Sequence, residues 1–191
     1  MAHNQEQHTK SDELYRRYLT GDNEAFEDLV ALLEDDLARY IFNIVHDYYE
    51  TKHLTIEAFA RLAVGGGKFA FRSTVKTYLF TIGRNLCCQH IKKRGKETHV
   101  PYEEVLETLA DAGESPDVIL EREENKRRLH AAMCEMKEDH RTVLDLIYFQ
   151  DMSYLEAAKV MSKTVRQIEG LARRAKETLK TKLEKDEQFN Y

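Results

Sequence analysis

A chain of 191 residues can form one large domain or two small ones. It is 33% charged and 42% hydrophobic, with net charge -5, two prolines and eight glycines, which favours small helical units over one thick core. No run approaches the ~20 apolar residues of a membrane helix, and the first residues lack the apolar segment of a secretory signal. We therefore expect a cytoplasmic protein without membrane insertion.

The first third of the chain predicts three helices. We expect residues 1–10 to be disordered and residues 12–20 to form a helix that ends at Gly21. Asn23 is expected to cap a long helix whose apolar residues recur at i, i+3, i+4 and i+7, which is a core-facing stripe. A third helix is expected from about residue 49 to residue 63.

A glycine-rich loop and a basic helix follow. Three glycines at 65–67 mark the loop, and Ser73 or Thr74 can cap the helix expected over 75–96. That helix has no acid between residues 84 and 96 and ends in a cluster of Lys and Arg. Part of this charge complements the helix dipole.

Aromatic residues on a flexible loop beside a basic helix suit single-stranded nucleic acid, because bases stack on rings while cations hold the backbone. For Tyr78 and Phe80 we favour a place in the core. For the loop residues Phe69 and Phe71, core packing and base stacking both stay open.

The adjacent Cys87 and Cys88, with Cys134, make an odd number of cysteines, which indicates reduced thiols in a reducing compartment. Together with His90, the pair does not have the spacing of a four-ligand zinc site. We expect no metal and no cofactor.

The next segment changes character. Residues 97–121 contain eight acidic residues and no Lys or Arg. We interpret 97–115 as an acidic linker, with a short helix at 102–109, that DNA would repel. Another helix begins within 116–136, and Asp139 is expected to cap the helix after it.

Residues 153–176 predict two helices joined by a tight turn. Ser153 with Glu156, and Thr164 with Gln167, have the spacing of capping boxes. The second helix has one apolar stripe, and its other face offers Arg and Gln to a DNA major groove, where Arg can fork onto guanine and Gln onto adenine. A glycine on this face allows close approach of the backbone. The candidate contacts are Lys163, Thr164, Arg166, Gln167, Gly170, Arg173 and Arg174.

A helix–turn–helix is also a common way to pack a small bundle. The charge pattern favours DNA binding: from Lys159 to Lys185, nine Lys or Arg stand against three Glu in a chain of net charge -5. A basic island in an acidic chain is the footprint of a phosphate-binding element.

Two separated blocks resemble one family, the bacterial extracytoplasmic-function sigma factors of RNA polymerase. Region 2 of that family resembles LTIEAFARL (54–62), FRSTVKTYLFTIGRN (71–85) and IKKRGK. Region 4 resembles MKEDHRTVLDLIYFQDMSYLEAAKVMSKTVRQIEGLARRAKETL (136–179). The chain departs from the family pattern in its triple glycine and at His53, Ile56, Tyr78 and Ser162.

The resemblance implies an all-α protein of two small helical domains joined by the acidic linker. Residues 11–96 would be the region 2 domain, and residues 116–191 the region 4 domain with the helix–turn–helix that reads the −35 element. Region 2 would bind the polymerase clamp and open the −10 element. The implied −10 contacts are Lys68, Phe69, Phe71, Arg72, Ser73, Arg84, Asn85, Lys92, Lys93 and Arg94. The implied polymerase-binding residues are Leu54, Glu57, Phe59 and Arg61.

The function that follows from the resemblance is that of an alternative sigma factor, which directs promoter recognition and transcription initiation. The implied partners are core RNA polymerase, through its clamp and flap, promoter DNA and an anti-sigma factor. The alternative is a stand-alone helix–turn–helix regulator, which would bind DNA tightly without polymerase, usually as a symmetric dimer. We do not expect an enzyme, because the sequence offers no Gly-rich phosphate loop, no paired metal carboxylates and no nucleophile–base pair.

Overall fold

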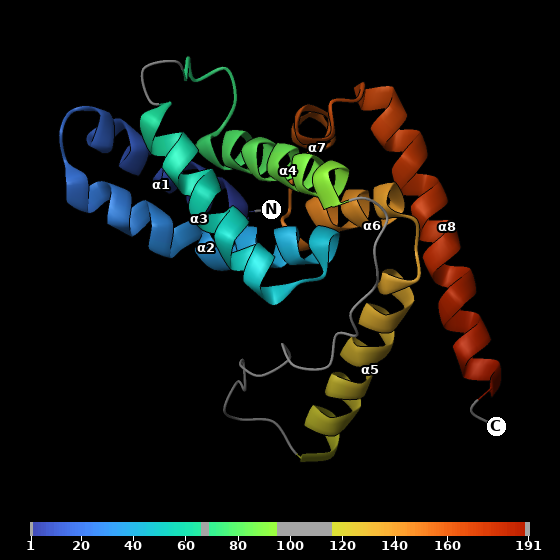
Figure 1. Ribbon diagram of the computed structural model, residues 1–191. Helices are drawn as coiled ribbons and strands as arrows, with labels where there is room; N and C mark the ends of the chain where they lie inside the picture. The colour runs from blue at the N-terminus through green and yellow to red at the C-terminus, as the bar shows by residue number, and fades with distance from the viewer. Residues whose placement is uncertain (1, 66–68, 95–115, 190–191) are drawn as a thin grey trace.

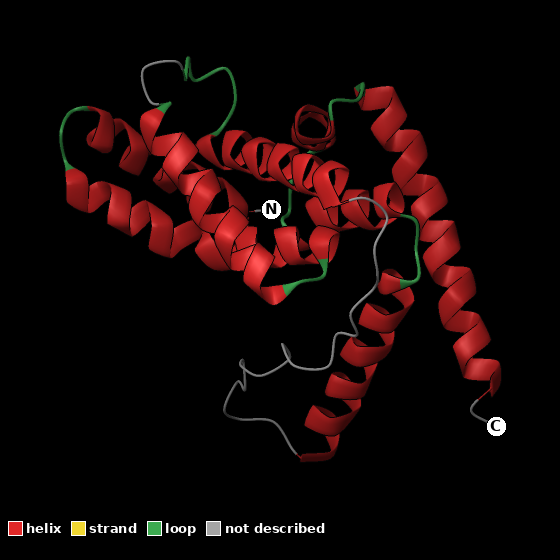
Figure 2. Ribbon diagram, in the orientation of Figure 1, coloured by secondary structure: helices red, strands yellow, loops and turns green. Residues whose placement is uncertain are grey.

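The computed structural model describes residues 2–65, 69–94 and 116–189, and these ranges are almost entirely helical, with no β-strand among them (Figure 2). The predicted all-α class is confirmed. The expected linker, residues 97–115, and its short helix lie outside the described residues.

In the N-terminal half, three helices pack against the long second helix of the chain, as Figure 1 shows from one side. These helices are α1 (Ala2–Leu19), α2 (Asn23–Val45), α3 (Tyr48–Val64) and α4 (Val75–Arg94). The predicted stripe on α2 is buried, including Leu29, Leu33 and Ile41. Gly83 lets α4 approach α2 closely, because a Cβ there would meet Leu37 Cδ1 at 3.0 Å.

Aspartates cap two of these helices. Asp22 Oδ1 accepts from Ala25 N at 3.2 Å, so Asp22 rather than Asn23 is the cap of α2. Asp47 Oδ1 accepts from the backbone nitrogen of Glu50 at 3.0 Å and caps α3. The prediction for residues 1–10 was wrong, because the backbone of α1 is helical from Ala2 onwards.

The C-terminal half begins with a helix that packs against the last one. Its elements are α5 (Pro116–Cys134), α6 (Glu138–Leu144), the π-helical segment η2 (Asp145–Phe149), α7 (Tyr154–Met161) and α8 (Val165–Phe189). Asp139 does not cap α6, since Lys137 holds the cap position without a side-chain hydrogen bond and Asp139 lies in the first turn. The helix expected to continue from α6 changes to π geometry at Asp145, which is buried.

The two halves are packed together. In Figure 1, α7 and α6 lie beside α4, whereas α8 and α5 form the far edge of the molecule. α7 packs against α4, and α6 packs against α2. Both predicted nucleic-acid-binding regions therefore belong to one compact arrangement.

Candidate nucleic-acid interface

The start of α8 is set by a reciprocal cap. Thr164 Oγ1 accepts from the backbone nitrogen of Gln167 at 3.2 Å, and Thr164 N donates to Gln167 Oε1 at 2.8 Å. The predicted capping box is therefore present. It also uses the oxygen that Gln167 would need for a two-bond contact with adenine, which leaves its amide NH2 as the group free for a base.

One face of α8 is buried and the opposite face is open to solvent. Ile168, Ala172 and Ala175 are buried in the core, whereas Val165, expected on the same stripe, is partly exposed. The side chains on the open face belong to Arg166, Gln167, Arg173 and Arg174, all exposed. The fold thus presents three guanidinium groups and one amide along a single helical face.

Gly170 lies on this open face, and the fold does not require a glycine there. A Cβ at Gly170 would meet Arg174 Nη1 at 3.4 Å, which is an ordinary contact, and no other atom is as near. The missing side chain leaves room for an approaching backbone, as in the predicted DNA contact.

α7 and the turn support α8. The Ser153–Glu156 capping box starts α7, with Ser153 N donating to Glu156 Oε2 at 3.0 Å. The turn residue Ser162 is in the left-handed region with φ 52°, a conformation that favours glycine. Leu155 is 57% exposed, so the buried side of α7 is formed by its alanines, Val160 and Met161.

Lys163 is the one predicted −35 residue whose charge is held by another part of the described chain. Its Nζ lies 3.1 Å from Asp139 Oδ2 in the first turn of α6. The sequence gives no local signal for this pair, because the two residues belong to different helices.

The loop before α4 brings its two phenylalanines into an aromatic cluster. Phe69 is 8% exposed and stacks on Tyr78, with ring centroids 4.8 Å apart. Phe71 lies 4.7 Å from Phe69, and Arg16 of α1 sits 4.0 Å above the Phe71 ring. For Phe69 the core interpretation holds, whereas Phe71 is half-buried and Arg72 exposed.

Phe71 has φ 51°. A bulky residue in the left-handed region is uncommon and is found at strained, often functional, positions. Its ring contacts with Phe69 and Arg16 hold it in this conformation. Of the remaining predicted loop residues, Ser73 is half-buried, and Lys68 lies outside the described residues.

A side chain of α1 helps to cap the start of α4. Thr74 Oγ1 accepts from Thr77 N at 3.2 Å, which confirms Thr74 as a cap. Asp12 Oδ1 accepts from Val75 N at 2.7 Å, so a residue 63 positions away satisfies a second free amide of this helix.

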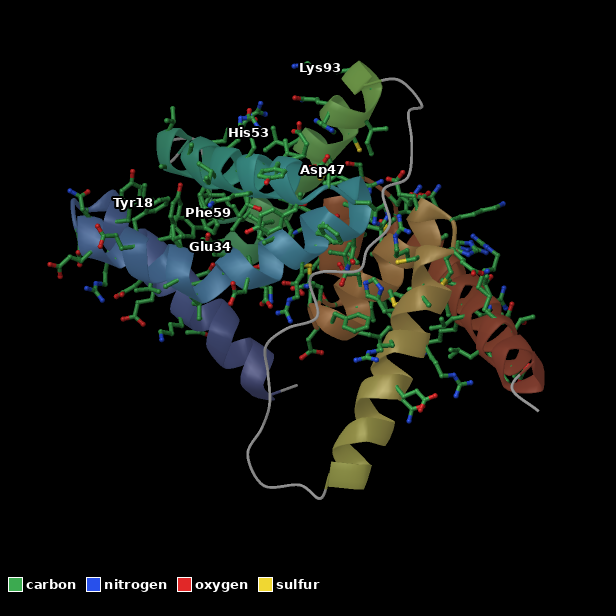
Figure 3. The ribbon with its side chains drawn as sticks, turned by 60° about the horizontal axis from the view of Figure 1, so that its bottom comes forward. Tyr18, Glu34, Asp47, His53, Phe59 and Lys93 are labelled. Carbon is green, nitrogen blue, oxygen red and sulfur yellow. The ribbon has the colours of Figure 1, made fainter. Side chains whose placement is uncertain are left out.

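The predicted DNA contacts on α4 fall into two groups, one exposed to solvent and one paired with acidic residues. Asn85, Lys92 and Lys93 are exposed, and Figure 3 shows Lys93 at the outer end of the helix. Arg84, by contrast, is 14% exposed, and its guanidinium faces Asp139 at 3.5 Å and Glu138 at 3.9 Å. The backbone of Arg94 ends the helix, and its side chain is outside the described residues.

Two of the four predicted polymerase-binding residues are not available on the surface. Leu54 and Phe59 are buried in the core, and Phe59 packs against Phe26. Glu57 and Arg61 form an ion pair of 2.7 Å along the outer side of α3.

The outer side of α3 also carries apolar residues that the sequence argument missed. Ile56 is 59% exposed and Val64 is 91% exposed, and Tyr49 is open to solvent on the same helix. His53 lies on this side too (Figure 3). The signal for this face was present in the sequence as Ile56, an apolar residue at a position that the inward-facing stripe leaves out.

The cysteines and histidines do not form a binding centre in the described ranges. Cys87 is buried, and burial raises the pKa of its thiol to about 12. His90 faces Glu50 at 3.4 Å. Among the residues that the structure describes, no three His, Cys, Asp or Glu are gathered in a way that could hold a metal ion. None of the described helices is long and apolar enough to cross a membrane.

Comparison with known proteins gives two family matches. The family model described as Sigma-70 region 2 matches residues 29–97, and the one described as Sigma-70, region 4 matches residues 126–179. Together they cover more than half of the chain, and each contains one of the two candidate surfaces.

Several relatives are similar over most of their length. The RNA polymerase sigma-H factor of Pseudomonas aeruginosa is 29% identical, over 89% of this chain and 92% of the relative. The ECF RNA polymerase sigma factor SigW of Bacillus subtilis is 22% identical, over 85% of this chain and 91% of the relative. The fold resembles that of the sigma factor RpoE in its complex with the anti-sigma factor NepR from Bartonella quintana, with TM-score 0.65, 21% identity, and coverage of 83% of this chain and 96% of RpoE.

Proposed function

The chain belongs to the extracytoplasmic-function family of RNA polymerase sigma factors, and we propose that its two candidate surfaces divide promoter recognition between them. As an alternative sigma factor it binds core RNA polymerase and directs promoter recognition and transcription initiation. It acts as a regulator of transcription, and we assign it no catalytic chemistry of its own. Since core polymerase works in the cytoplasm, the proposal places the chain there.

The observation that carries the proposal is the open face of α8. Arg166, Gln167, Arg173 and Arg174 are exposed along one side of a helix whose start is fixed by a capping box and whose other side is buried. A rigid helix with these groups near its N-terminus fits the major groove of the −35 element. Arg166 is the nearest of the three arginines to the helix start, so we assign it to a base and assign Arg174 to a phosphate.

The loop at 68–73 and the cationic part of α4 form the proposed −10 surface. Phe71, Arg72 and Ser73 would contact an unstacked base, and Asn85, Lys92, Lys93 and Arg94 would contact the strand. Extruding a base costs a few kcal/mol, which stacking of about 1–3 kcal/mol per base can offset. Phe69 supports the loop from within the aromatic cluster rather than by contact with DNA.

The outer side of α3 is the proposed polymerase-binding surface. Glu57 and Arg61 keep the role first assigned to them, and the exposed Ile56 adds an apolar contact. Leu54 and Phe59 hold the helix in place from the core. The domains proposed are residues 11–96 for region 2 and 116–191 for region 4, joined by the linker at 97–115.

Partners that restrain the chain are also proposed. RpoE is bound by an anti-sigma factor in the structure that resembles this fold, and an anti-sigma factor is the partner we expect here. Two weak DNA-binding surfaces bind one promoter more tightly than either alone only when the distance between them is fixed. Polymerase would fix this distance through its clamp and flap.

The experiment is run-off transcription. The purified chain is mixed with core polymerase and fragments of its own genome, with core polymerase alone as the control. Discrete new transcripts are expected, and their absence on every template would contradict the proposal. A gel shift with and without polymerase tests the alternative, because a stand-alone regulator binds DNA equally well without polymerase.

A further inference from the structure

Two adjacent tyrosines are exposed where α3 begins, directly after the turn from α2. Tyr48 is 59% exposed and Tyr49 is 82% exposed, and their ring centroids lie 5.7 Å apart with an angle of 79° between the ring planes. In this edge-to-face arrangement the two rings do not cover one another, so ring faces stay open to solvent. The tyrosines also lie more than two turns of α3 before Glu57, which belongs to the proposed polymerase-binding surface.

The end of α4 lies against the start of α3. His90 Nδ1 of α4 is 3.4 Å from Glu50 Oε2, and Glu50 directly follows Tyr49 in the chain. Lys93 comes three residues after His90, which places it one turn further along the same side of α4. Figure 3 shows Lys93 at the outer end of α4 and Asp47 at the start of α3. The tyrosines and the lysines at the end of α4 therefore belong to one region of the surface.

The exposed charges of this region are positive. Lys92 and Lys93 are exposed, and so is Lys52, which lies one turn of α3 beyond the tyrosines. Within the part of the chain that the structure describes, no carboxylate is paired with any of these three lysines. Glu50, the acid beside the tyrosines, faces His90 instead. The region therefore offers cations to a polyanion.

Exposed rings beside lysines suit single-stranded nucleic acid, because bases stack on the rings while cations hold the phosphates. In a duplex the bases are stacked on one another, so the rings would select an opened strand. The proposed −10 surface already includes Lys92 and Lys93. Helix α4 has 20 residues and is therefore about 30 Å long, which corresponds to about nine stacked nucleotides. The tyrosines lie at the opposite end of this helix from the loop that would receive the −10 base.

We propose that Tyr48, Tyr49, Lys52, Lys92 and Lys93 form a second site for single-stranded DNA, the tyrosine site, which binds the opened promoter strand at a distance from the −10 base. Stacking tolerates every base, so the tyrosine site would add affinity for an open strand without adding sequence preference. The inference rests on the proposed function for the origin of this strand. The site is exposed in the free chain and can be tested without polymerase.

The first test measures stacking through affinity. Fluorescence anisotropy at low salt follows binding of the full chain to a labelled oligothymidine of about 20 nucleotides. Tyr48→Leu with Tyr49→Leu removes both rings and keeps apolar side chains. The matched control, Tyr148→Leu with Phe149→Leu, removes two exposed rings of η2. The tyrosine variant should bind at least about fivefold more weakly than the control, because it loses the bases stacked on its rings.

A direct signal of stacking is available because the chain contains no tryptophan. Tyr49→Trp keeps a ring at the site and adds a single indole to the chain. Oligothymidine should quench the fluorescence of this indole, and the affinity should be at least that of the wild type. Tyr148→Trp, on η2, is the control and should keep its fluorescence. A ring with a structural role alone would give no quenching.

The lysines are tested through the salt dependence of binding. Lys92→Gln with Lys93→Gln should lower the slope of log affinity against log salt by about 1.4, because each phosphate contact on a single strand contributes about 0.7. Lys137→Gln with Lys180→Gln removes two exposed lysines elsewhere and should leave the slope unchanged. Thermal melting shows that each variant is folded. An unchanged slope in the α4 variant would contradict the proposed site.

Equal affinity of the tyrosine variant and its control, without quenching in Tyr49→Trp, would overturn the tyrosine site. A tyrosine variant that no longer co-elutes with core polymerase, but binds oligothymidine like its control, would assign the rings to a protein contact and also overturn the proposal. Run-off transcription with the wild type is done in parallel. Transcripts without a tyrosine effect would remove the tyrosine site alone, whereas a tyrosine effect without transcripts on any template would remove the sigma function and keep the single-strand site.

Discussion

The two proposed DNA surfaces differ in how ready they are to bind. On α8 the arginines stand exposed on a helix whose start is capped within four residues. At the −10 surface, Phe69 is buried, Phe71 holds a left-handed backbone, and Arg84 is paired with acids of the other half. A preformed helix suits duplex DNA, whose base edges are already displayed, whereas part of the surface for an opened strand, at Phe69 and Arg84, is packed against other parts of the chain.

The largest expected effect lies on the open surface. Arg166→Ala should relax the preference for one base of the −35 element, at a cost of about 1–3 kcal/mol at that position. Arg174→Ala, as its matched control, should weaken binding to all sequences alike, because it removes a phosphate contact. Both are measured with polymerase present, by competition among duplexes that differ at single positions. An unchanged base preference in Arg166→Ala would show that α8 meets DNA through another side.

The packing of the two halves should depend on pH, because Asp145 is buried where η2 meets α2. Burial raises the pKa of this carboxyl to about 7 from 3.8, against the hydrogen bond from Asn43 and the charge of Arg39, which lower it. The packed form then binds the proton more tightly than the separated form. Packing should be strongest below about pH 4, weaken as pH rises and level off above about pH 7.

Between pH 6 and pH 8 the ionisation of Asp145 should shift the equilibrium between packed and separated halves about tenfold towards the separated form. Fluorescence energy transfer between probes on α3 and α8 measures it. Asp145→Asn is the control, because the amide keeps the shape and does not ionise in this range. If the variant shows the same pH profile as the wild type, the titration belongs to another group.

Two glycines allow a smaller, paired test, because Gly170 lies on the open face of α8 and Gly83 is buried between α4 and α2. Gly170→Ala should stabilise the free protein by up to about 1 kcal/mol, because alanine favours a helix and its Cβ meets only an ordinary contact. It should nevertheless bind −35 duplex several times more weakly. Gly83→Ala should instead lower the melting temperature, since its Cβ would approach Leu37 Cδ1 at 3.0 Å. If Gly170→Ala binds DNA as well as the wild type, the backbone of α8 does not approach DNA at this point.

The smallest expected effect comes from two of the residues in the left-handed region, Ser162 and Phe71. Ser162→Gly should stabilise the fold by less than about 1 kcal/mol, because glycine accepts φ 52° without strain. Phe71→Gly relieves the same kind of strain and also loses ring contacts with Phe69 and Arg16, so no gain is expected. Chemical denaturation measures both. A gain in Phe71→Gly would mean that the loop aromatics do not stabilise the free protein.

What the sequence alone determined is local. The all-α class, the stripe on α2, both capping boxes of the helix–turn–helix and the open face of α8 follow from residues a few positions apart. The predicted cap of α2, Asn23, was wrong by one residue, because Asp22 and Asn23 are equally good caps and the structure uses Asp22.

Only the tertiary structure decided which predicted contacts are free. Lys159 reaches the Arg72 carbonyl across 87 positions, and Thr77 reaches Glu156 across 79. Asp12 caps α4 from 63 residues away. A side chain in a sequence carries its charge but not its partner, since the partner is chosen by how helices pack. For that reason the sequence predicts Arg84 and Lys163 as cations available to DNA, whereas in the fold both are paired with acidic residues.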